Sequence, residues 1–195
     1  MPEVIEDRKS QIHHAACKLF HQQGFHGTSI RDIAERVGML GGSLYSHISS
    51  KDEILWEIVD AAADRFFSAL RPIVDSQLGT LQKLKAAIVA HVGVIAGDMD
   101  AAAVYTVEWR HLAPDRRAAF TKRRDEYELM FRSLVREAIH SRYIAAPDET
   151  TATLFILSVL NWMFTWYRPD GPMTPEDVGR WMSEYIFDGL RRRTA

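Results

Sequence analysis

Residues 28–55, which read TSIRDIAERVGMLGGSLYSHISSKDEIL, place two short helices around a tight turn and then begin a third helix. The apolar residues of the first helix recur at helical spacing, as Ile30, Ile33, Ala34 and Val37. Thr28 or Ser29 can cap the first free amides of this helix, and Asp32 supplies the acid of a capping box. Gly38 stands where the helix must stop and reverse, because glycine takes the left-handed conformation without steric cost.

The second helix of this segment turns mainly small or polar residues outward. Leu44 and Ile48 give it one apolar edge, and the remaining positions are Gly41, Gly42, Ser43, Tyr45, Ser46 and His47. Small residues let a backbone approach the floor of a DNA groove, and the larger ones can bond phosphate oxygens. Ser50 and Glu53 then form a second capping box, and Lys51 at the start of this third helix suits a phosphate group.

The residues before and within this segment follow a many-positioned pattern. In order, they are Ile12, Ala15, Ala16, Leu19, Phe20, Gly24 and Phe25, then Thr28-Ser29-Ile30, Ile33-Ala34, Gly38, Leu44-Tyr45 and Lys51. Residues 9 to about 69 therefore resemble the TetR family of bacterial regulators. The chain departs from the family pattern at Gly41, where lysine is frequent, at His47, where tyrosine is common, and at Ile48, where phenylalanine is usual. These departures concern base preference.

The predicted DNA surface follows from this geometry. The helix near residues 40–47 enters the major groove, and a dimer places two such helices about 34 Å apart on a palindromic operator. Phosphate contacts are expected from Thr28, Tyr45, His47 and Lys51. Base edges or thymine methyl groups are expected to meet Leu40, Gly41, Gly42 and Ser43, with Ser29 and Ser46 completing the surface. Few long side chains reach the groove, so DNA shape is expected to contribute to specificity.

The rest of the chain predicts an all-α protein. Its 195 residues suit a small amino-terminal module and a larger helical body, and the apolar residues recur at helical rather than alternating spacing. We expect a three-helix DNA-binding domain over residues 9–69 and a ligand-binding and dimerisation domain over residues 70–195. A single cysteine, Cys17, permits no internal disulfide, and the amino terminus lacks the apolar run of a secretion signal, so a cytoplasmic location is expected.

Charge alone does not predict DNA binding. The chain has a formal net charge of −2. Residues 1–55 contain six Lys/Arg (8, 9, 18, 31, 36, 51) against seven Asp/Glu (3, 6, 7, 32, 35, 52, 53), so the DNA-binding half lacks an overall basic excess. The placement of individual charges therefore matters more than their sum.

The periodic apolar pattern predicts the remaining helices. They cover about residues 6–23, 50–71, 81–96, 101–112, 115–141 and 154–167. A last helix follows, and Thr174, Pro175 and Asp177 open it with a cap, a proline at its first position and an acid near its dipole. Within the first, His14, Cys17 and His21 share one face, but no fourth ligand or flanking metal motif accompanies them, and no metal site is predicted. A hinge is expected at residues 68–80, where Pro72 and Gly79 interrupt the pattern.

The segment 154–167 is the most apolar of the chain, yet it is too short to span a membrane. It is expected to be a buried helix. One polar line runs along it through Ser158, Asn161, Thr165 and Arg168. Buried polar groups need partners, so this line faces either a partly polar cavity or a partner subunit. Both alternatives remain open at this point.

The last helix carries a wide apolar seam, formed by Val178, Trp181, Met182, Tyr185, Ile186 and Gly189. Together with the segment 154–167, it presents more apolar surface than one small body can cover. A homodimer with a two-fold four-helix interface is the simplest solution.

The body resembles one branch of the TetR family. The resemblance is carried by Glu108-Trp109-Arg110, Arg123-Arg124-Asp125-Glu126-Tyr127 and Trp166-Tyr167-Arg168-Pro169 with Gly171-Pro172. Members of this branch bind acyl-coenzyme A thioesters of fatty acid or steroid catabolism. The resemblance implies a two-domain homodimer that represses nearby genes and leaves its operator when the effector binds.

The effector is expected among the helices at 101–112, 115–141 and 154–167. The candidate polar contacts are Arg123, Tyr127, Asn161, Thr165 and Arg168. The alternative is a drug-sensing regulator of an efflux pump, in which Trp109, Trp162, Phe164 and Trp166 enclose flat compounds and Glu108 attracts cations. Core packing is the ordinary role of such aromatic residues.

An enzyme is not expected. The sequence lacks a nucleophile elbow, a phosphate loop with lysine and a dinucleotide fingerprint, and no cofactor is predicted. Glu108 and His111, with His91, are the one candidate acid and base set, but such pairs usually satisfy each other structurally.

Overall fold

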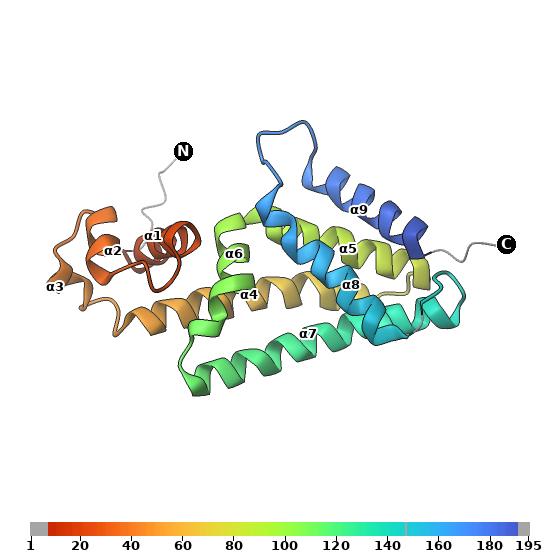
Figure 1. The fold of residues 1–195 in the computed structure, drawn as a ribbon, viewed down its shortest axis with the longest axis horizontal. Helices are drawn as coiled ribbons and strands as arrows, with labels where there is room; N and C mark the ends of the chain where they lie inside the picture. The colour runs from red at the N-terminus through yellow and green to blue at the C-terminus, as the bar shows by residue number, and fades with distance from the viewer. Residues whose placement is uncertain (1–7, 147, 191–195) are drawn as a thin grey trace. The chain divides into compact units, whose positions relative to one another are not determined.

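The computed structural model describes residues 8–146 and 148–190, and all regular structure in these residues is helical (Figure 1). The α-helices are α1 (Arg8–Gln23), α2 (Ile30–Arg36), α3 (Gly41–Leu44), α4 (Lys51–Val74), α5 (Thr80–Gly97), α6 (Met99–Val107), α7 (Pro114–His140), α8 (Glu149–Asn161) and α9 (Pro175–Leu190). Two 3₁₀ helices, η1 (Glu108–His111) and η2 (Trp162–Thr165), follow α6 and α8. The predicted all-α class is confirmed.

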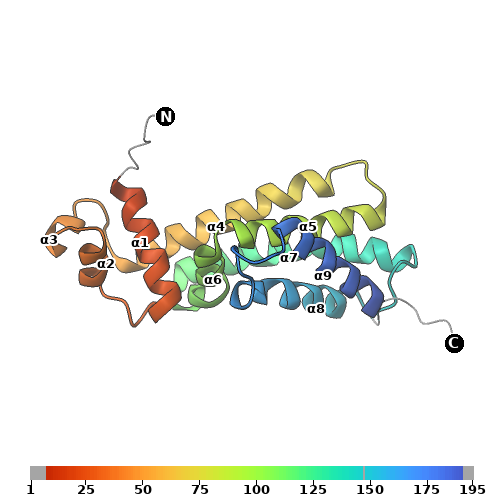
Figure 2. The same ribbon diagram turned by 90° about the horizontal axis from the view of Figure 1, so that it is seen from above.

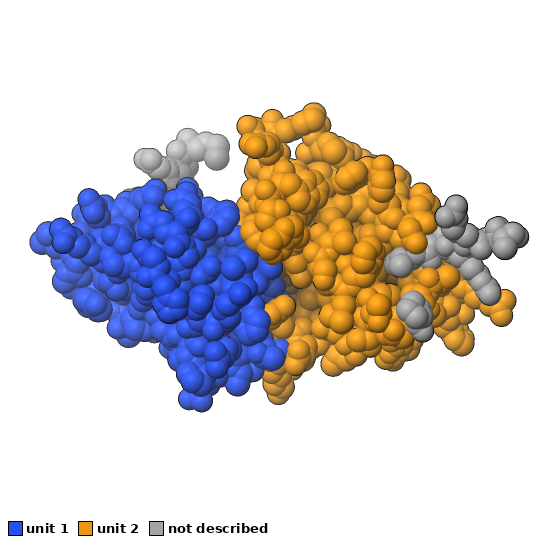
Figure 3. Space-filling view, in the orientation of Figure 1, with its two compact units in different colours: residues 1–62, 100–121 blue, residues 63–99, 122–195 orange. Residues whose placement is uncertain are grey.

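The chain forms two compact units, which Figure 3 distinguishes by colour. Unit 1 comprises residues 1–62 and 100–121, and unit 2 comprises residues 63–99 and 122–195. The boundaries fall inside α4, after the first residue of α6 and inside α7. Unit 1 therefore includes most of α6, all of η1 and the first part of α7 in addition to the amino-terminal helices. The division predicted from the sequence, at residue 69, stays a prediction about domains.

In unit 1, the ends of α2 have the predicted chemistry. The Ser29 hydroxyl accepts a hydrogen bond from the Asp32 amide at 3.1 Å, and the Asp32 carboxylate accepts one from the Ser29 amide at 2.7 Å. The latter bond lowers the pKa of Asp32 below its ordinary value. Gly38 has a φ of +68°, and the Met39 amide donates back to the Ala34 carbonyl at 2.8 Å, which closes the helix in a Schellman motif.

The α3 helix is shorter than the predicted span of residues 40–47. Regular helix covers only Gly41–Leu44, and turns continue to His47. Two glycines at its start carry a high entropic cost in a helix, and the Ser46 hydroxyl donates to the Ser43 carbonyl at 2.7 Å, which favours a turn. Leu44 and Ile48 are buried, as predicted.

The start of α4 differs from the prediction by one residue. The Ser50 hydroxyl accepts from the Glu53 amide at 3.0 Å, as expected, but the Glu53 carboxylate accepts from the Ser49 amide at 2.7 Å instead of the Ser50 amide. The helix then continues through Pro72 to Val74. Pro72 lies in the last turn of α4, so its missing N–H and its clash with the preceding turn affect only the end of the helix.

In unit 2, α5 and α9 pack side by side, as Figures 1 and 2 both show. The close approach depends on Gly179 of α9. A Cβ atom at this position would lie 2.9 Å from the Val89 Cα atom of α5. Glycine therefore lets the two helix backbones meet without a side chain between them.

Replacing Gly179 with alanine should destabilise the fold by about 1–3 kcal/mol, because the added methyl group meets backbone that cannot move aside cheaply. Gly93→Ala is the matched control. Gly93 also lies within a helix, but its Cβ position is open space. This control should gain about 0.5–1 kcal/mol from reduced backbone entropy in the unfolded chain. Urea unfolding measures both, and equal shifts in the same direction would contradict the packing argument.

The segment 154–167 is only half buried, which corrects the prediction of a buried helix. α8 ends at Asn161, and η2 continues the segment to Thr165. One side is buried, and the other exposes Leu154, Phe155, Val159, Trp162 and Trp166. The reason is that no other element of the described chain covers this second face.

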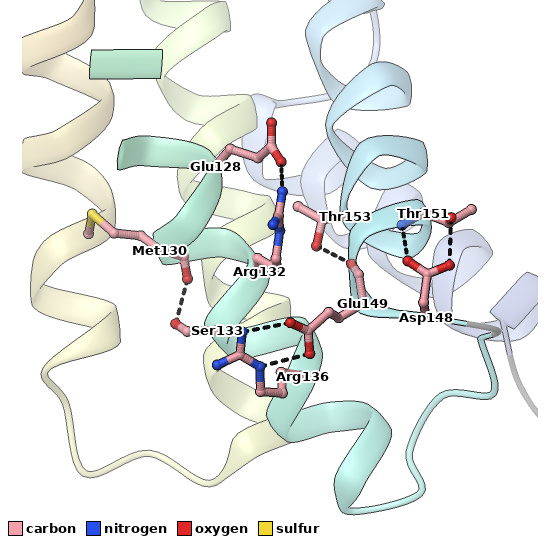
Figure 4. A network of polar contacts seen from close by, with 9 residues as sticks. All are labelled: Glu128, Met130, Arg132, Ser133, Arg136, Asp148, Glu149, Thr151 and Thr153. Atoms are coloured by element: carbon pink, nitrogen blue, oxygen red, sulfur yellow. Dashed lines mark hydrogen bonds and ion pairs between the residues drawn. The ribbon is translucent and has the colours of Figure 1, made fainter. Parts of the chain in front are cut away.

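At the corner between α7 and α8, charged side chains hold the two helices together (Figure 4). The Arg136 guanidinium donates twice to the Glu149 carboxylate, at 2.7 and 2.6 Å. The Asp148 carboxylate caps α8 by accepting from the Thr151 amide at 2.8 Å. At the start of α9, the predicted cap is confirmed, since the Thr174 hydroxyl accepts from the Asp177 amide at 3.1 Å.

Candidate DNA interface and effector site

The α3 helix and the turn after it form an exposed surface in unit 1. Leu40 is 80% exposed and Tyr45 is 58% exposed, which is unusual for large apolar side chains. The smaller predicted contacts on this surface are also exposed, namely Gly42, Ser43, Ser46 and His47, and Gly41 is half-buried. Most of the predicted DNA residues therefore lie on one accessible helix and its turn.

Thr28 does not belong to this surface, and its predicted phosphate contact is corrected. Its side chain is 1% exposed, and its hydroxyl donates to the Gly24 carbonyl at 3.0 Å. The neighbouring Ser29 is exposed, but its hydroxyl serves as the cap of α2. Burial in the loop that joins α1 and α2 thus takes Thr28 out of reach of DNA.

Lys51 has a structural role that the sequence did not indicate. Its ammonium group donates to the carbonyls of Phe25 and Thr28, both at 2.7 Å, and lies 4.2 Å from the centre of the Phe25 ring. Burial lowers the pKa of Lys51 below its ordinary value. The ammonium ties the loop before α2 to the start of α4, which uses two of its three N–H donors, and its phosphate contact stays a prediction.

The α2 helix carries two exposed cations that the sequence analysis did not propose as DNA contacts. Arg31 lies in the first turn of this helix and Arg36 in its last, and both are exposed. In helix-turn-helix proteins, the helix before the recognition helix crosses the DNA backbone. The position of Arg31 and Arg36 on this helix could have predicted a phosphate contact from the sequence. The sequence analysis expected that contact from Lys51 instead.

Residues 100–121 are bound to the amino-terminal helices of unit 1 by polar contacts. The Glu108 carboxylate accepts from the Phe25 amide at 2.8 Å, and the His21 ring lies 2.6 Å from the Asp100 carboxylate. The Asp52 carboxylate accepts from the Ala113 amide at 2.8 Å. The segment from α6 to the start of α7 is therefore part of the same compact unit as the recognition helix.

This arrangement gives Glu108 and Trp109 structural contacts, and their effector roles stay a prediction. Glu108 is committed to the Phe25 amide, and the Trp109 ring packs 5.8 Å from that of Phe120. The candidate acid and base pair is also structural, since Glu108 and His111 lie 3.8 Å apart and the His111 ring is 3.0 Å from that of His26. Neither Glu108 nor Trp109 is in unit 2, where the other predicted effector residues lie.

Unit 2 brings Tyr127 and Asn161 together through a third residue, His91. The His91 Nδ1 atom lies 2.9 Å from the Tyr127 hydroxyl, and its Nε2 atom lies 3.1 Å from the Asn161 Oδ1 atom. The aromatic rings of Phe66 and Phe131 pack against His91, at 4.8 and 6.1 Å between ring centres. The sequence analysis considered His91 only as a remote candidate base. The three residues lie on three different helices, so spacing along the sequence could not predict that they meet.

Burial lowers the pKa of His91 to about 4, against a smaller opposing effect of the hydrogen bond to Asn161. The folded chain therefore holds a neutral imidazole at pH 7. Above pH 6.5, the ordinary pKa of histidine, the stability contributed by this burial is complete. As the pH falls from 6.5 towards 4, the unfolded chain binds a proton that the folded chain excludes, so the stability is lost.

We expect the free energy of unfolding to fall by roughly 3 kcal/mol across this range on account of His91. In a His91→Gln variant, this part of the pH dependence should be absent, because glutamine does not titrate. Denaturant unfolding of both proteins at several pH values between 7 and 4.5 measures the effect. Parallel pH profiles for the two proteins would contradict it.

The other predicted effector residues are not part of the hydrogen-bonded set of Tyr127, His91 and Asn161. Arg123 pairs with Asp64 and lies 5.6 Å from the centre of the Phe67 ring. Trp162 is 57% exposed, and Thr165 and Arg168 are exposed as well. The polar line predicted along this segment is therefore divided, since Asn161 bonds inward and Ser158, Thr165 and Arg168 face outward.

A groove of about 650 Å³ also runs along α4 and α5 in unit 2. Small residues line its floor, among them Ser68, Ala69, Ala90 and Gly93. Its volume is in the range of small-molecule sites. None of the effector residues predicted from the sequence lines it.

No single helix in the described residues is both long and apolar enough to cross a membrane, although the pair Thr80–Gly97 and Met99–His111 passes when taken together.

The capped α2, the glycine turn and the exposed α3 define a helix-turn-helix protein of the DNA-binding class. Residues 12–64 match the family described as bacterial regulatory proteins, tetR family, and residues 77–190 match the tetracyclin repressor-like C-terminal domain. The chain belongs to the TetR family of bacterial transcriptional regulators. The resemblance inferred from the sequence is confirmed over both halves.

Relatives and solved structures agree with this assignment. The HTH-type transcriptional repressor KstR2 of Mycobacterium tuberculosis is 27% identical over 190 residues, which are 96% of this chain and 95% of the relative. The structure of this ketosteroid transcriptional regulator has a TM-score of 0.89 at 28% identity, and covers 97% of each chain. The TetR family regulator PfmR from Thermus thermophilus has a TM-score of 0.82 at 31% identity, over 95% of this chain and 100% of that one.

A further structure, that of AibR in complex with isovaleryl coenzyme A and operator DNA, has a TM-score of 0.82 and covers 93% of this chain and 98% of AibR. At 24% identity, this likeness concerns the fold alone. KstR2 and PfmR are both named as transcription regulators.

Proposed function

We propose that this protein is a dimeric repressor of the TetR type that leaves a palindromic operator when it binds an acyl-coenzyme A thioester. It acts in the cytoplasm, where its DNA lies, and catalyses no reaction. Residues 9–69 bind DNA, and residues 70–195 bind the effector and the partner subunit. The observation that carries the proposal is the match to KstR2 over nearly the whole of both chains.

The exposed surface of α3 and the turn after it, here called the reading surface, supports the proposal that the protein binds DNA. Leu40 and Tyr45 are exposed apolar side chains on α3 and its turn, and two adjacent glycines leave room for close approach of the backbone to DNA. We assign base contacts to Leu40, Gly41, Gly42 and Ser43, and phosphate contacts to Tyr45, His47 and the cations of α2. A glycine-rich helix in the groove favours recognition by DNA shape in addition to base contacts.

An exposed apolar face supports the dimer. It comprises Leu154, Phe155, Val159, Trp162 and Trp166 of α8, η2 and the residue after it, with Trp181 and Tyr185 of α9. The Trp166 and Trp181 rings lie 6.4 Å apart, and the Trp181 and Tyr185 rings 4.8 Å apart, so the aromatic part is continuous. Soluble monomers rarely expose a patch of this kind, and a two-fold interface between two copies of α8 and α9 covers it.

The effector class rests on the relatives and on the groove in unit 2. KstR2 is named as a ketosteroid regulator, and AibR was solved with a coenzyme A thioester. Unit 2 also offers room for an apolar acyl group, in the groove of about 650 Å³ that small side chains of α4 and α5 line. Binding would favour one shape of the chain, and the loss of operator affinity cannot exceed the effector's preference for that shape.

The test has two stages. Duplexes selected from a random pool by the purified dimer define the operator, and fluorescence anisotropy then follows its release as ligands are added. Acyl-coenzyme A thioesters are expected to release the operator and to raise the melting temperature, whereas cationic dyes of the kind that efflux regulators sense should do neither. Release by dyes and not by thioesters would overturn the proposal.

A further inference from the structure

Among the large apolar side chains that the structure describes, Leu40 is the most exposed, at 80%. It occupies the N-cap position of α3, where it makes no side-chain hydrogen bond. Serine, threonine, asparagine and aspartate are strongly preferred at this position because their oxygens bond the free amides, and leucine is among the poorest choices. Leu40 thus neither caps its helix nor adds to the core, so the fold does not explain it.

The backbone holds Leu40 in a fixed position. The Met39 amide before it donates to the Ala34 carbonyl at 2.8 Å, and the Leu40 carbonyl accepts from the Ser43 amide at 2.9 Å. Leu44 is completely buried and anchors α3 in the core of unit 1. The Cα–Cβ bond of Leu40 therefore points in a direction that the folded chain sets before any DNA binds.

The residues that follow Leu40 leave its side chain unobstructed. Gly41 and Gly42 have no side chains, and a Cβ atom at either position would have no contact within 4 Å beyond its own neighbours in the helix. Residues 40–47 contain no arginine, lysine, asparagine or glutamine. These are the side chains that form bidentate hydrogen bonds with guanine or adenine in the major groove. The start of the reading surface therefore presents one apolar side chain rather than a set of donors.

An apolar side chain at this position can distinguish one group on the base edges. In helix-turn-helix proteins, the first residues of the recognition helix meet base edges in the major groove. Thymine alone among the four bases presents an apolar group there, its C5 methyl group, in addition to hydrogen-bonding groups. Contact with this methyl group removes apolar surface of both partners from water. A hydrogen-bonding group placed against Leu40 would instead lose its water without gaining a partner.

We infer that Leu40 is a specificity residue, which recognises the C5 methyl group of a thymine in each half-site of the operator. This inference rests on the DNA-binding part of the proposed function and does not depend on the effector. One buried methyl group raises the affinity about fourfold, so the two half-sites of a palindrome together give about 15-fold. The operators that the protein selects should therefore carry thymine at one fixed position of each half-site.

The experiment replaces each thymine of the operator in turn by deoxyuridine, which lacks only the methyl group. The operator is the one selected from the random pool, both half-sites are changed together, and fluorescence anisotropy gives the affinity. For the wild-type protein, one position should show binding that is about 15-fold weaker. For Leu40→Ala, the replacement at this position should have little effect, because the side chain that meets the methyl group is gone.

A base with the same methyl group gives a second measurement. Cytosine in place of the thymine at this position should weaken binding by the wild-type protein. 5-Methylcytosine there should restore part of the lost affinity, because it carries the methyl group of thymine on the same edge. Leu40→Ala should bind the cytosine and 5-methylcytosine operators equally.

Leu40→Ser separates base recognition from a role in the fold. Serine is a favoured N-cap residue, so the melting temperature of this variant should stay the same or rise, while its sensitivity to deoxyuridine disappears. A marked fall in melting temperature would assign Leu40 to the fold and overturn the inference. Leu78→Ala is the matched control, since Leu78 is an exposed leucine in the loop between α4 and α5 of unit 2. It should keep the wild-type pattern at every thymine.

The outcomes separate this inference from the proposed function. If no operator is selected from the pool, the DNA-binding proposal fails, and this inference fails with it. If an operator is selected and bound, but no thymine position distinguishes the wild-type protein from Leu40→Ala, the inference alone is overturned.

Discussion

A variant with Trp181→Asp and Tyr185→Asp is expected to be monomeric and to bind the operator at least about 100-fold more weakly than the wild-type protein. Both side chains lie on the exposed face of α9, and Tyr185 is 66% exposed. Two carboxylates on each face would be buried without partners in a two-fold interface and would repel their copies. Without the second subunit, the gain from binding two half-sites at once is lost, and that gain is on the order of 10²–10⁴.

Sedimentation velocity gives the oligomeric state, and anisotropy with a full operator and with a single half-site gives the affinities. The variant should bind both DNAs equally, because only one reading surface is then available. Leu129→Asp is the control, as Leu129 is an exposed apolar residue of α7, outside the face formed by α8, η2 and α9. A double variant that remained dimeric would place the interface elsewhere.

The second large effect is expected from Arg31 and Arg36. With Lys51 bound to the carbonyls of Phe25 and Thr28, these exposed arginines of α2 are the cations we assign to the DNA backbone. Each phosphate contact contributes about 0.9 to the slope of log affinity against log salt concentration. Two arginines in each of two subunits make four contacts, so Arg31→Ala with Arg36→Ala should reduce the slope by about 3.6.

The affinity of this variant should fall by about 10- to 1000-fold at moderate salt, and by similar factors for different operator sequences, because phosphate contacts carry no base information. Operator titrations between about 50 and 200 mM salt measure both quantities. Arg71→Ala removes an exposed arginine of unit 2 and controls for net charge. An unchanged slope in the double variant would exclude α2 from the phosphate contacts.

Local chemistry explains which parts of the sequence analysis were confirmed. The cap at Ser29 and Asp32, the left-handed Gly38 and the cap at Thr174 and Asp177 each depend on residues three to five positions apart. Such contacts form within one turn of backbone, so spacing along the chain predicts them. Helix type and approximate bounds follow in the same way from the apolar period.

The sequence analysis missed contacts between residues that lie far apart along the chain. Lys51 reaches back to Phe25, and Glu108 accepts from the Phe25 amide more than eighty positions away. In both cases the sequence analysis predicted a contact with DNA or effector, because the side chain is charged and belongs to a family motif. In the structure, each side chain is hydrogen-bonded to the backbone of Phe25. A contact to the backbone cannot be predicted from the type of the residue that supplies it.

The amino-acid sequence by itself determined the helices, their caps, the glycine turn and the identity of the residues on α3, because short-range hydrogen bonds and the helical period depend only on neighbours. Only the tertiary structure decided that Thr28 is buried, that residues 100–121 belong with the recognition helix, and that His91 connects Tyr127 to Asn161. Those outcomes depend on which helices pack together, and a buried polar group acquires its direction from partners that only this packing supplies.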